Sequence, residues 1–223
     1  EGIKFEVVEY LKTPFNEDDL AKLIEKIGIK PVELVRKNEG VFKEFYKGKN
    51  ADSLRWRIEH AQHLALDDIA RFADIGVIAA MQGIHATSDA VFVEKRLGSE
   101  RAKRGAYVWR KLIDSGAIIS AGTDAPVERI DPIANYYAMV TRKTPDGFAF
   151  FPEQKMTRLE ALKAYTINGA FAAFEEDIKG SLAKGKLADI TILSDDILSI
   201  PDEELPRLRI LYTIVGGKVL YER

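Results

Sequence analysis

The 223-residue sequence contains no cysteine. Disulfide bonds, thiolate metal ligands and cysteine nucleophiles are therefore excluded for this chain. Histidine is also scarce, because only His60, His63 and His85 are present. A histidine-rich metal site built by this chain alone must draw on those three residues.

The sequence also lacks an excess of either charge. It has 33 basic and 35 acidic side chains, a formal net charge of -2. A protein held to nucleic acid by bulk charge needs a basic excess, so we expect no nucleic-acid partner. No apolar run approaches the roughly 20 residues of a membrane helix, and the first residues lack the basic and apolar regions of a signal peptide. We therefore expect a cytoplasmic protein with no membrane partner.

From about residue 53 onward, strand-like and helical patterns alternate. The expected strands are residues 55–60, 77–81 and 117–122, and the expected helices are residues 67–73, 106–113, 132–140 and one that begins at Thr157. Glu160 stands where a capping box needs it. The second and third strands are almost continuously apolar, which fits a parallel sheet buried on both faces. The pattern predicts an α/β parallel architecture.

The two ends of the chain differ from the middle. At the carboxyl end, residues 187–193, 209–215 and 218–221 are strand-like, with a hairpin turn at Gly216 and Gly217. Near the amino end, residues 4–11 alternate as in a strand, and residues 16–28 have helical spacing. We therefore expect three domains, which are residues 1–50, 51–180 and 181–223.

Two residues that could ligate a metal end predicted strands. His60 ends one strand and Asp124 follows another, and functional groups gather at strand ends in parallel α/β folds. Such a pair could hold a divalent metal and orient a water molecule. In the alternative interpretation, His60 is a hydrogen-bonded structural residue and Asp124, before Ala125 and Pro126, is a turn residue.

The other two histidines follow in loops. His63 gives an H-x-x-H spacing with His60, which does not place both rings on one face at a strand end. We expect His63 to be a loop residue or a residue behind the site. His85 follows the next strand and could face the same opening, with Asp89 in a polar loop after it. The alternative is that His85 only caps a helix or binds water.

Three motifs occur in the order found in one family. They are residues 57–62 (RIEHAQ), 81–89 (MQGIHATSD) and 122–128 (GTDAPVE), followed by residues 161–166 (ALKAYT), 185–189 (GKLAD) and 213–219 (TIVGGKV). Residues 51–223 thereby resemble amidohydrolase family 3, the formamide-deformylase-like branch of the amidohydrolase superfamily.

The resemblance implies a metal-binding (β/α)8 barrel with a small β-sandwich domain. It places His60 as a metal ligand after the sixth strand, and Asp124 as metal ligand and catalytic proton carrier after the eighth. His85 would lie near the substrate after the seventh strand, and we group Asp89 with it as substrate-binding. The implied reaction is hydrolysis of C–N bonds in a small molecule, with a divalent metal, zinc by preference, as cofactor.

Much of the family's metal site has no counterpart in this sequence. The first-strand H-x-H pair, the bridging lysine and the fifth-strand histidine are missing, and no histidine precedes His60. Only the last three barrel strands are matched, so this chain cannot close a barrel. We therefore expect weak zinc binding, negligible hydrolysis by the chain alone, and either a homo-oligomer or a complementing fragment.

The first 48 residues resemble a different family, the arsenate-reductase-like (Spx-like) branch of the thioredoxin fold. Residues 2–14, 20–28 and 34–39 carry this match. The resemblance implies that Arg36 binds an oxyanion, although an exposed cation at a helix end is the interpretation we favour. A reductase is nearly excluded because the catalytic cysteine is missing.

Two hypotheses therefore remain. In the first, the chain belongs to a metal-dependent hydrolase acting on amide-like, non-peptide C–N bonds. In the second, it is a fused or truncated module without turnover, because most metal ligands are missing. Residues 1–50 would then be a fragment joined to the hydrolase part near Asn50.

Overall fold

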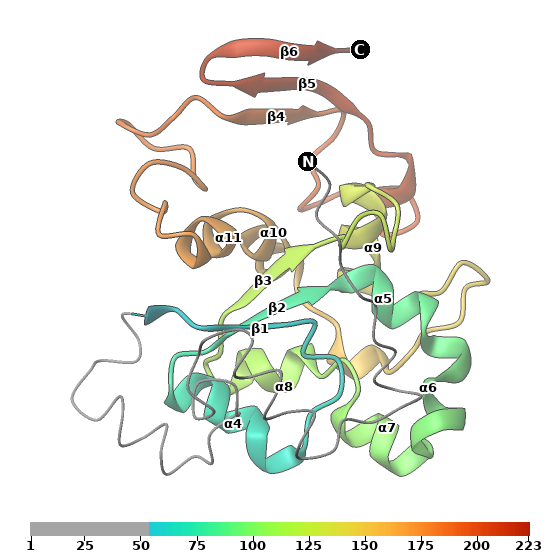
Figure 1. Ribbon diagram of the computed structural model, residues 1–223. Coiled ribbons are helices and arrows are strands. Elements are labelled where there is room, and N and C mark those ends of the chain that lie inside the picture. The colour runs from blue at the N-terminus through green and yellow to red at the C-terminus, as the bar shows by residue number, and fades with distance from the viewer. Residues whose placement is uncertain (1–53) are drawn as a thin grey trace, which may run out of the picture. The chain divides into compact units, whose positions relative to one another are not determined.

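A computed structural model describes residues 54–223 of the chain (Figure 1). The chain divides into two units, Glu1–Asn50 and Ala51–Arg223, and the description below concerns the second. The strand predicted at residues 4–11, the helix predicted at residues 16–28 and the candidate anion ligand Arg36 lie outside the described residues. None of the helices in residues 54–223 has the length and apolar character needed to cross a membrane.

A three-stranded parallel sheet forms the centre of the second unit. Its strands are β1 (Arg57–Glu59), β2 (Ile78–Gln82) and β3 (Ile119–Gly122), in the order β1-β2-β3. Every residue of β2 is buried, which explains its unbroken apolar sequence. All three side chains of β1 are exposed, so the described residues leave this edge uncovered. The prediction of an α/β parallel architecture is confirmed.

Helices pack on the sheet as the alternating sequence pattern predicts. Figure 1 shows α4 (Leu66–Asp74) and α8 (Trp109–Asp114) below the sheet, and α10 (Arg158–Tyr165) and α11 (Ile167–Ala172) beside β3 on the side away from β2. Helix α8 begins at Trp109 instead of the predicted residue 106. The reason is local, because Ala106 pairs with His63 in an isolated bridge and Tyr107 has a φ of 51°.

The segment between β2 and α8 is helical, which corrects the expectation of a polar loop around Asp89. It contains α5 (Gly83–Ser88), α6 (Ala90–Leu97) and α7 (Ser99–Gly105). Asp89 separates α5 from α6, and Gly98 separates α6 from α7 with a φ of 78° that few other residues adopt. His85 therefore lies on a helix, not in a strand-end loop.

Helix α9 (Pro132–Thr141) and α10 begin at the caps that their sequences indicate. The Asp131 side chain accepts a hydrogen bond from the Ala134 amide at 2.9 Å. Thr157 and Glu160 form the predicted capping box at α10. Two short 3-10 turns follow elsewhere in the chain, η2 (Pro152–Gln154) and η3 (Leu205–Arg207).

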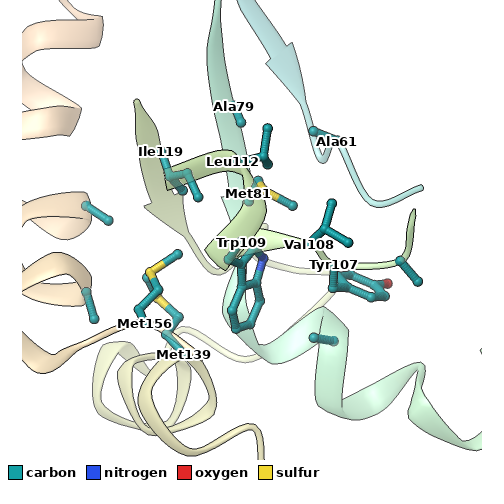
Figure 2. Close-up of a cluster of buried hydrophobic side chains, with 14 of the residues drawn as sticks. Ala61, Ala79, Met81, Tyr107, Val108, Trp109, Leu112, Ile119, Met139 and Met156 are labelled. Atoms are coloured by element: carbon teal, nitrogen blue, oxygen red, sulfur yellow. The ribbon is translucent and has the colours of Figure 1, made fainter. Parts of the chain in front are cut away.

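The core lies between the sheet and these helices. Figure 2 shows Trp109 between Met81 of β2 and the neighbouring pair Met139 and Met156. Trp109 has no exposed surface. The spacing of Ile69, Ala70 and Phe72 in α4 predicts that all three point inward, but only Ile69 and Phe72 are buried and Ala70 is exposed. A nine-residue helix packed on one face buries only a narrow stripe.

The carboxyl-terminal residues form a second sheet. Strands β4 (Ile190–Leu193), β5 (Ile210–Val215) and β6 (Lys218–Glu222) are antiparallel in the order β4-β5-β6. The predicted hairpin turn is confirmed, with Gly216 and Gly217 at φ values of 56° and 78°. All residues of β6 are exposed. That this sheet is half of a sandwich stays a prediction.

Candidate metal centre

Three side chains of the metal-binding type meet at the carboxyl ends of the parallel strands. His60 directly follows β1, His85 lies three residues after β2, and Asp124 lies two residues after β3. One ligand atom from each lies within 4.8 Å of the others. Parallel strands end on the same edge of a sheet, which is why residues 60 and 124 come together. His85, Asp124 and His60 are buried, half-buried and exposed, respectively.

The backbone at two of these residues is left-handed. His60 has a φ of 69° and Asp124 a φ of 57°. Such conformations cost on the order of 1–3 kcal/mol for residues other than glycine and are concentrated at functional sites. The surrounding backbone holds them, since the His60 amide donates to Ala80 at 2.7 Å and the Asp124 carbonyl accepts from Val127 at 2.8 Å.

His85 presents an unpartnered nitrogen to Asp124. Its Nε2 is buried without a hydrogen-bond partner and lies 3.8 Å from Asp124 Oδ2. Its Nδ1 lies 3.2 Å from the side-chain amide nitrogen of Gln62. Because amide nitrogen and oxygen are exchangeable by rotation, Gln62 can also accept the Nδ1 proton, which leaves a lone pair on Nε2. A metal ion would give that buried nitrogen its missing partner.

His60 is held in a similar way. Its Nδ1 lies 3.0 Å from Gln82 Oε1, an acceptor, so Nδ1 carries the proton in that contact. Nε2 then keeps its lone pair, as in metal-ligating histidines whose other nitrogen donates to a neighbouring group. The rings of His60 and His85 have their centroids 6.0 Å apart. Both candidate ligands therefore have an amide side chain that can set the tautomer required for metal binding.

Two imidazoles and one carboxylate fit a divalent metal. This donor set is typical of catalytic zinc sites with three protein ligands and an open position. Sequence reasoning assigned His60 and Asp124 as ligands and placed His85 near the substrate. The structure brings His85 into the same group, because one turn of α5 returns its side chain to the edge where β2 ends.

Asp89 and His63 lie outside this group of three. The Asp89 carboxylate accepts a hydrogen bond from the Tyr107 hydroxyl. Burial and this bond to Asp89 both raise the pKa of Tyr107. His63 packs edge-on against the Tyr107 ring with centroids 5.6 Å apart. Desolvation lowers the pKa of His63. The expectation that His63 lies behind the site or in a loop stays a prediction, and so does substrate binding by Asp89.

Asn135 ties the loops of the centre together, and sequence reasoning missed it. Its side-chain amide donates to the Gly122 carbonyl at 3.0 Å and accepts from the Ile84 amide at 2.6 Å. The side chain has no exposed surface. Because Gly122 ends β3 and Ile84 is the second residue of α5, Asn135 sets the spacing between Asp124 and His85. The sequence signal that could have identified Asn135 is its polar side chain within the otherwise mostly apolar stretch of α9.

A family model described as "Amidohydrolase family" matches residues 30–221. The chain belongs to the amidohydrolase family. The match covers most of the chain, including both β-sheets and all three residues of the metal centre. It begins upstream of the predicted junction near residue 50, within the stretch that resembles the arsenate-reductase-like family. That second resemblance, and the junction itself, stay predictions.

Relatives with curated descriptions agree with this membership. The chain is 40% identical over 168 residues to the protein LONG AFTER FAR-RED 3 of Arabidopsis thaliana, covering 75% of this chain and 29% of the relative. It is 32% identical over 175 residues to an N-substituted formamide deformylase of Arthrobacter pascens, covering 78% of this chain and 32% of the relative. The chain thus spans about a third of the length of these relatives. The predicted membership in family 3, the formamide-deformylase-like branch, is confirmed.

Comparison with a solved structure also places the chain within a larger hydrolase. An uncharacterised metal-dependent hydrolase from Pyrococcus horikoshii OT3 superposes with a TM-score of 0.62 at 26% identity. The match covers 74% of this chain and 33% of that protein. The described α/β unit therefore corresponds to part of the fold of that larger protein.

Proposed function

We propose that this chain forms the carboxyl-terminal part of the active site of a metal-dependent amidohydrolase. The reaction is hydrolysis of amide-like, non-peptide C–N bonds in a small molecule. The observation that carries the proposal is the meeting of His60, His85 and Asp124, whose ligand atoms lie within 4.8 Å of one another at the strand ends. Membership in the amidohydrolase family supports it.

The donor set favours zinc as the cofactor. Two imidazole nitrogens and one carboxylate oxygen suit zinc better than magnesium or calcium, which prefer oxygen ligands. When bound, zinc supplies Lewis-acid chemistry that polarises the reacting carbonyl and a water molecule. Gln62 and Gln82 support the site by contacting Nδ1 of His85 and Nδ1 of His60, respectively.

Asp124 is the residue placed to move the proton. Its side chain is one-third exposed, so it can reach both a substrate and the two imidazoles. Water adds to the carbonyl carbon, and Asp124 takes the proton that the water loses. Asp124 then gives this proton to the nitrogen as the C–N bond breaks. The products are a carboxylic acid and an amine, so atoms and charge balance.

The complete site needs more polypeptide than these strands provide. A barrel of this type has eight strands, and the described residues contribute three parallel ones. The exposed side chains of β1 favour a partner on that edge. The further ligands would come from additional polypeptide, either covalently connected or in a second molecule. The same exposed edge is the observation that favours the second candidate, a module without turnover.

Zinc titration of the purified chain tests the metal centre. We expect one weak site per chain, measured by competition with a chromophoric chelator. His60→Ala, His85→Ala and Asp124→Ala should each lower the affinity by about tenfold or more. His63→Ala is the matched control and should leave it unchanged. A chain that binds no zinc, or that loses zinc equally in the His63→Ala variant, would contradict the proposal.

Hydrolysis is tested by restoring the rest of the barrel. The chain alone should show negligible turnover of N-formyl and N-acyl amines. Co-expression with the amino-terminal two thirds of a family relative should produce activity that disappears in Asp124→Asn. If the two fragments form a stable zinc-containing complex without turnover, the module hypothesis replaces the hydrolase proposal.

A further inference from the structure

A pocket lies between the loop that follows β1 and helices α6 and α7. Its volume is about 420 Å3, and the residues that line it are His63, Leu64, Ala65, Leu66, Asp67, Leu97, Arg101, Arg104 and Gly105. They come from three places, the loop after β1, the start of α4 and the facing helices α6 and α7. The first lining residue along the chain, His63, directly follows Gln62, whose side chain contacts His85.

The pocket concentrates positive charge from two arginines, Arg101 and Arg104. Arg101 and Arg104 are spaced by three residues on α7, so they share a face of the helix. Within residues 54–223, neither guanidinium has an ion pair or a side-chain hydrogen bond. Residues 94–104 contain five cations and two glutamates, in a chain whose net charge is -2.

One carboxylate also lines the pocket. Asp67 contributes a single negative charge against the two arginines, so the charge of the lining stays positive. Asp67 belongs to the first turn of α4, where an acidic side chain is favourable for the helix itself. The Ala65 cap gives this helix start no side-chain hydrogen bond.

The remaining wall is apolar. Leu64, Leu66 and Leu97 line the pocket together with Ala65. A bare inorganic ion would leave this surface exposed to water, whereas a ligand with a hydrocarbon portion would cover it. The lining therefore combines a site for an anionic group with a surface for a short apolar chain.

We propose that this pocket binds an organic anion with a carboxylate or phosphate head and a short apolar tail. Arg101 and Arg104 hold the head, since guanidinium groups match the planar oxygens of both anions. Leu64, Leu66 and Leu97 cover the tail. His63 lines the same pocket.

The binding does not depend on hydrolysis. If the proposed function also holds, the position of His63 directly after Gln62 makes this pocket the place for the charged end of a substrate whose C–N bond lies at Asp124. That second step rests on the proposed function. The binding experiment below needs neither zinc nor turnover, so the two can fail separately.

Isothermal titration calorimetry of the full chain without metal tests the pocket. The probes are hexanoate and hexyl phosphate, with acetate, inorganic phosphate and hexanol as their truncated forms. We expect at least one of the two complete probes to bind about tenfold tighter than its truncated forms. Comparison of hexanoate with hexyl phosphate identifies the preferred head. Absence of binding by both, or equal binding of inorganic phosphate and hexyl phosphate, would overturn the proposal.

Three substitutions localise the binding. Arg101→Gln and Arg104→Gln should each weaken it by about tenfold, because a charge-assisted hydrogen bond is lost. Lys103→Gln removes the same charge from the same helix outside the pocket and should have little effect. Asp67→Asn should strengthen binding a few-fold. If Lys103→Gln weakens binding as much as Arg101→Gln, the effect is general electrostatic attraction and the pocket assignment is wrong.

Discussion

The side-chain amide of Gln62 lies 3.2 Å from Nδ1 of His85 and joins the loop after β1 to helix α5. This contact fixes the ring of a buried histidine whose other nitrogen faces Asp124. Partners of this kind set the tautomer and orientation of metal-ligating histidines. Gln62 therefore has a specific consequence for metal affinity, although it does not reach the metal position itself.

Replacement of Gln62 tests this relationship. We expect Gln62→Leu to lower zinc affinity by roughly 10–100-fold, because Nδ1 of His85 loses the side-chain amide that orients the ring. Gln62→Glu keeps an acceptor at the same position and should restore most of the affinity. The measurement is competition with a chromophoric chelator. Equal affinities for Gln62→Leu and the original chain would show that His85 does not ligate the metal.

Asp124 combines a carboxylate with a strained backbone, and two substitutions separate these properties. Asp124→Gly relieves the positive φ of 57° and should stabilise the fold by about 1 kcal/mol, while zinc affinity falls. Asp124→Asn tolerates the same backbone conformation and should lower zinc affinity with little change in stability. Urea unfolding followed by circular dichroism measures both. A destabilised Asp124→Gly variant would contradict the strain argument.

The sheets were predictable from sequence because their signals are local. Strands β2 and β3 follow from nearly unbroken apolar runs, and the Gly216–Gly217 hairpin follows from its turn glycines. The helical run from α5 to α7 was not predictable in the same way. This run consists of three short helices separated by Asp89 and Gly98. Helix α5 packs on the distant α9, and α6 and α7 pack on each other.

The metal centre was predictable in part for the same physical reason. His60 and Asp124 end strands, so their meeting follows from the parallel sheet alone. The approach of His85 depends on where α5 begins, and that is set by Gly83. A Cβ at Gly83 would lie 2.3 Å from the Met139 side chain and 2.8 Å from the Asn135 carbonyl. Such a contact between α5 and α9 has no signature in the local sequence.

The capping box of α10 predicts that the free energy of unfolding decreases at acid pH. Hydrogen bonding by Arg110, which lies 2.9 Å from Glu160 Oε1, lowers the pKa of Glu160 to about 2 from its usual 4.5. Glu160 therefore binds fewer protons folded than unfolded between pH 4.5 and 2. Its stabilisation is complete above pH 4.5 and is lost as the pH falls toward 2.

Glu160→Gln should remove that dependence. We expect a loss on the order of 1–2 kcal/mol at pH 7 and a much smaller difference from the original chain near pH 2. Urea unfolding across this pH range measures both values. Glu153→Gln, in the short η2 turn, is a matched control with no capping role. A Glu160→Gln difference that stays constant with pH would contradict the assigned role of the Arg110 contact.

Arg142 is a buried cation without a carboxylate partner in the described part of the chain. Its Nε donates to the Phe150 carbonyl at 2.8 Å and its Nη1 to the Tyr107 carbonyl at 3.1 Å. The guanidinium also lies over Trp109, 4.3 Å from the ring centroid. Desolvation lowers the pKa of Arg142 to about 9. Arg142 therefore links the backbone at Phe150 to the backbone at Tyr107 by two hydrogen bonds, and its burial costs desolvation energy.

Arg142→Lys keeps the positive charge but removes the guanidinium group that donates to both carbonyls. We expect it to destabilise the fold by about 2–4 kcal/mol, because an ammonium cannot replace both bonds and leaves a buried carbonyl unpaired. Arg96→Lys, an exposed arginine 5.3 Å from the Phe92 ring, should change stability by less than about 0.5 kcal/mol.

Arg142→Met tests the cost of burying the charge. Because burial lowers the pKa of Arg142 in the folded chain relative to the unfolded one, the original chain should gain stability relative to Arg142→Met as the pH rises through the folded pKa. Urea unfolding at pH 7.5 and pH 10 measures this change. A stability difference that is independent of pH would mean that Arg142 keeps its charge in the fold.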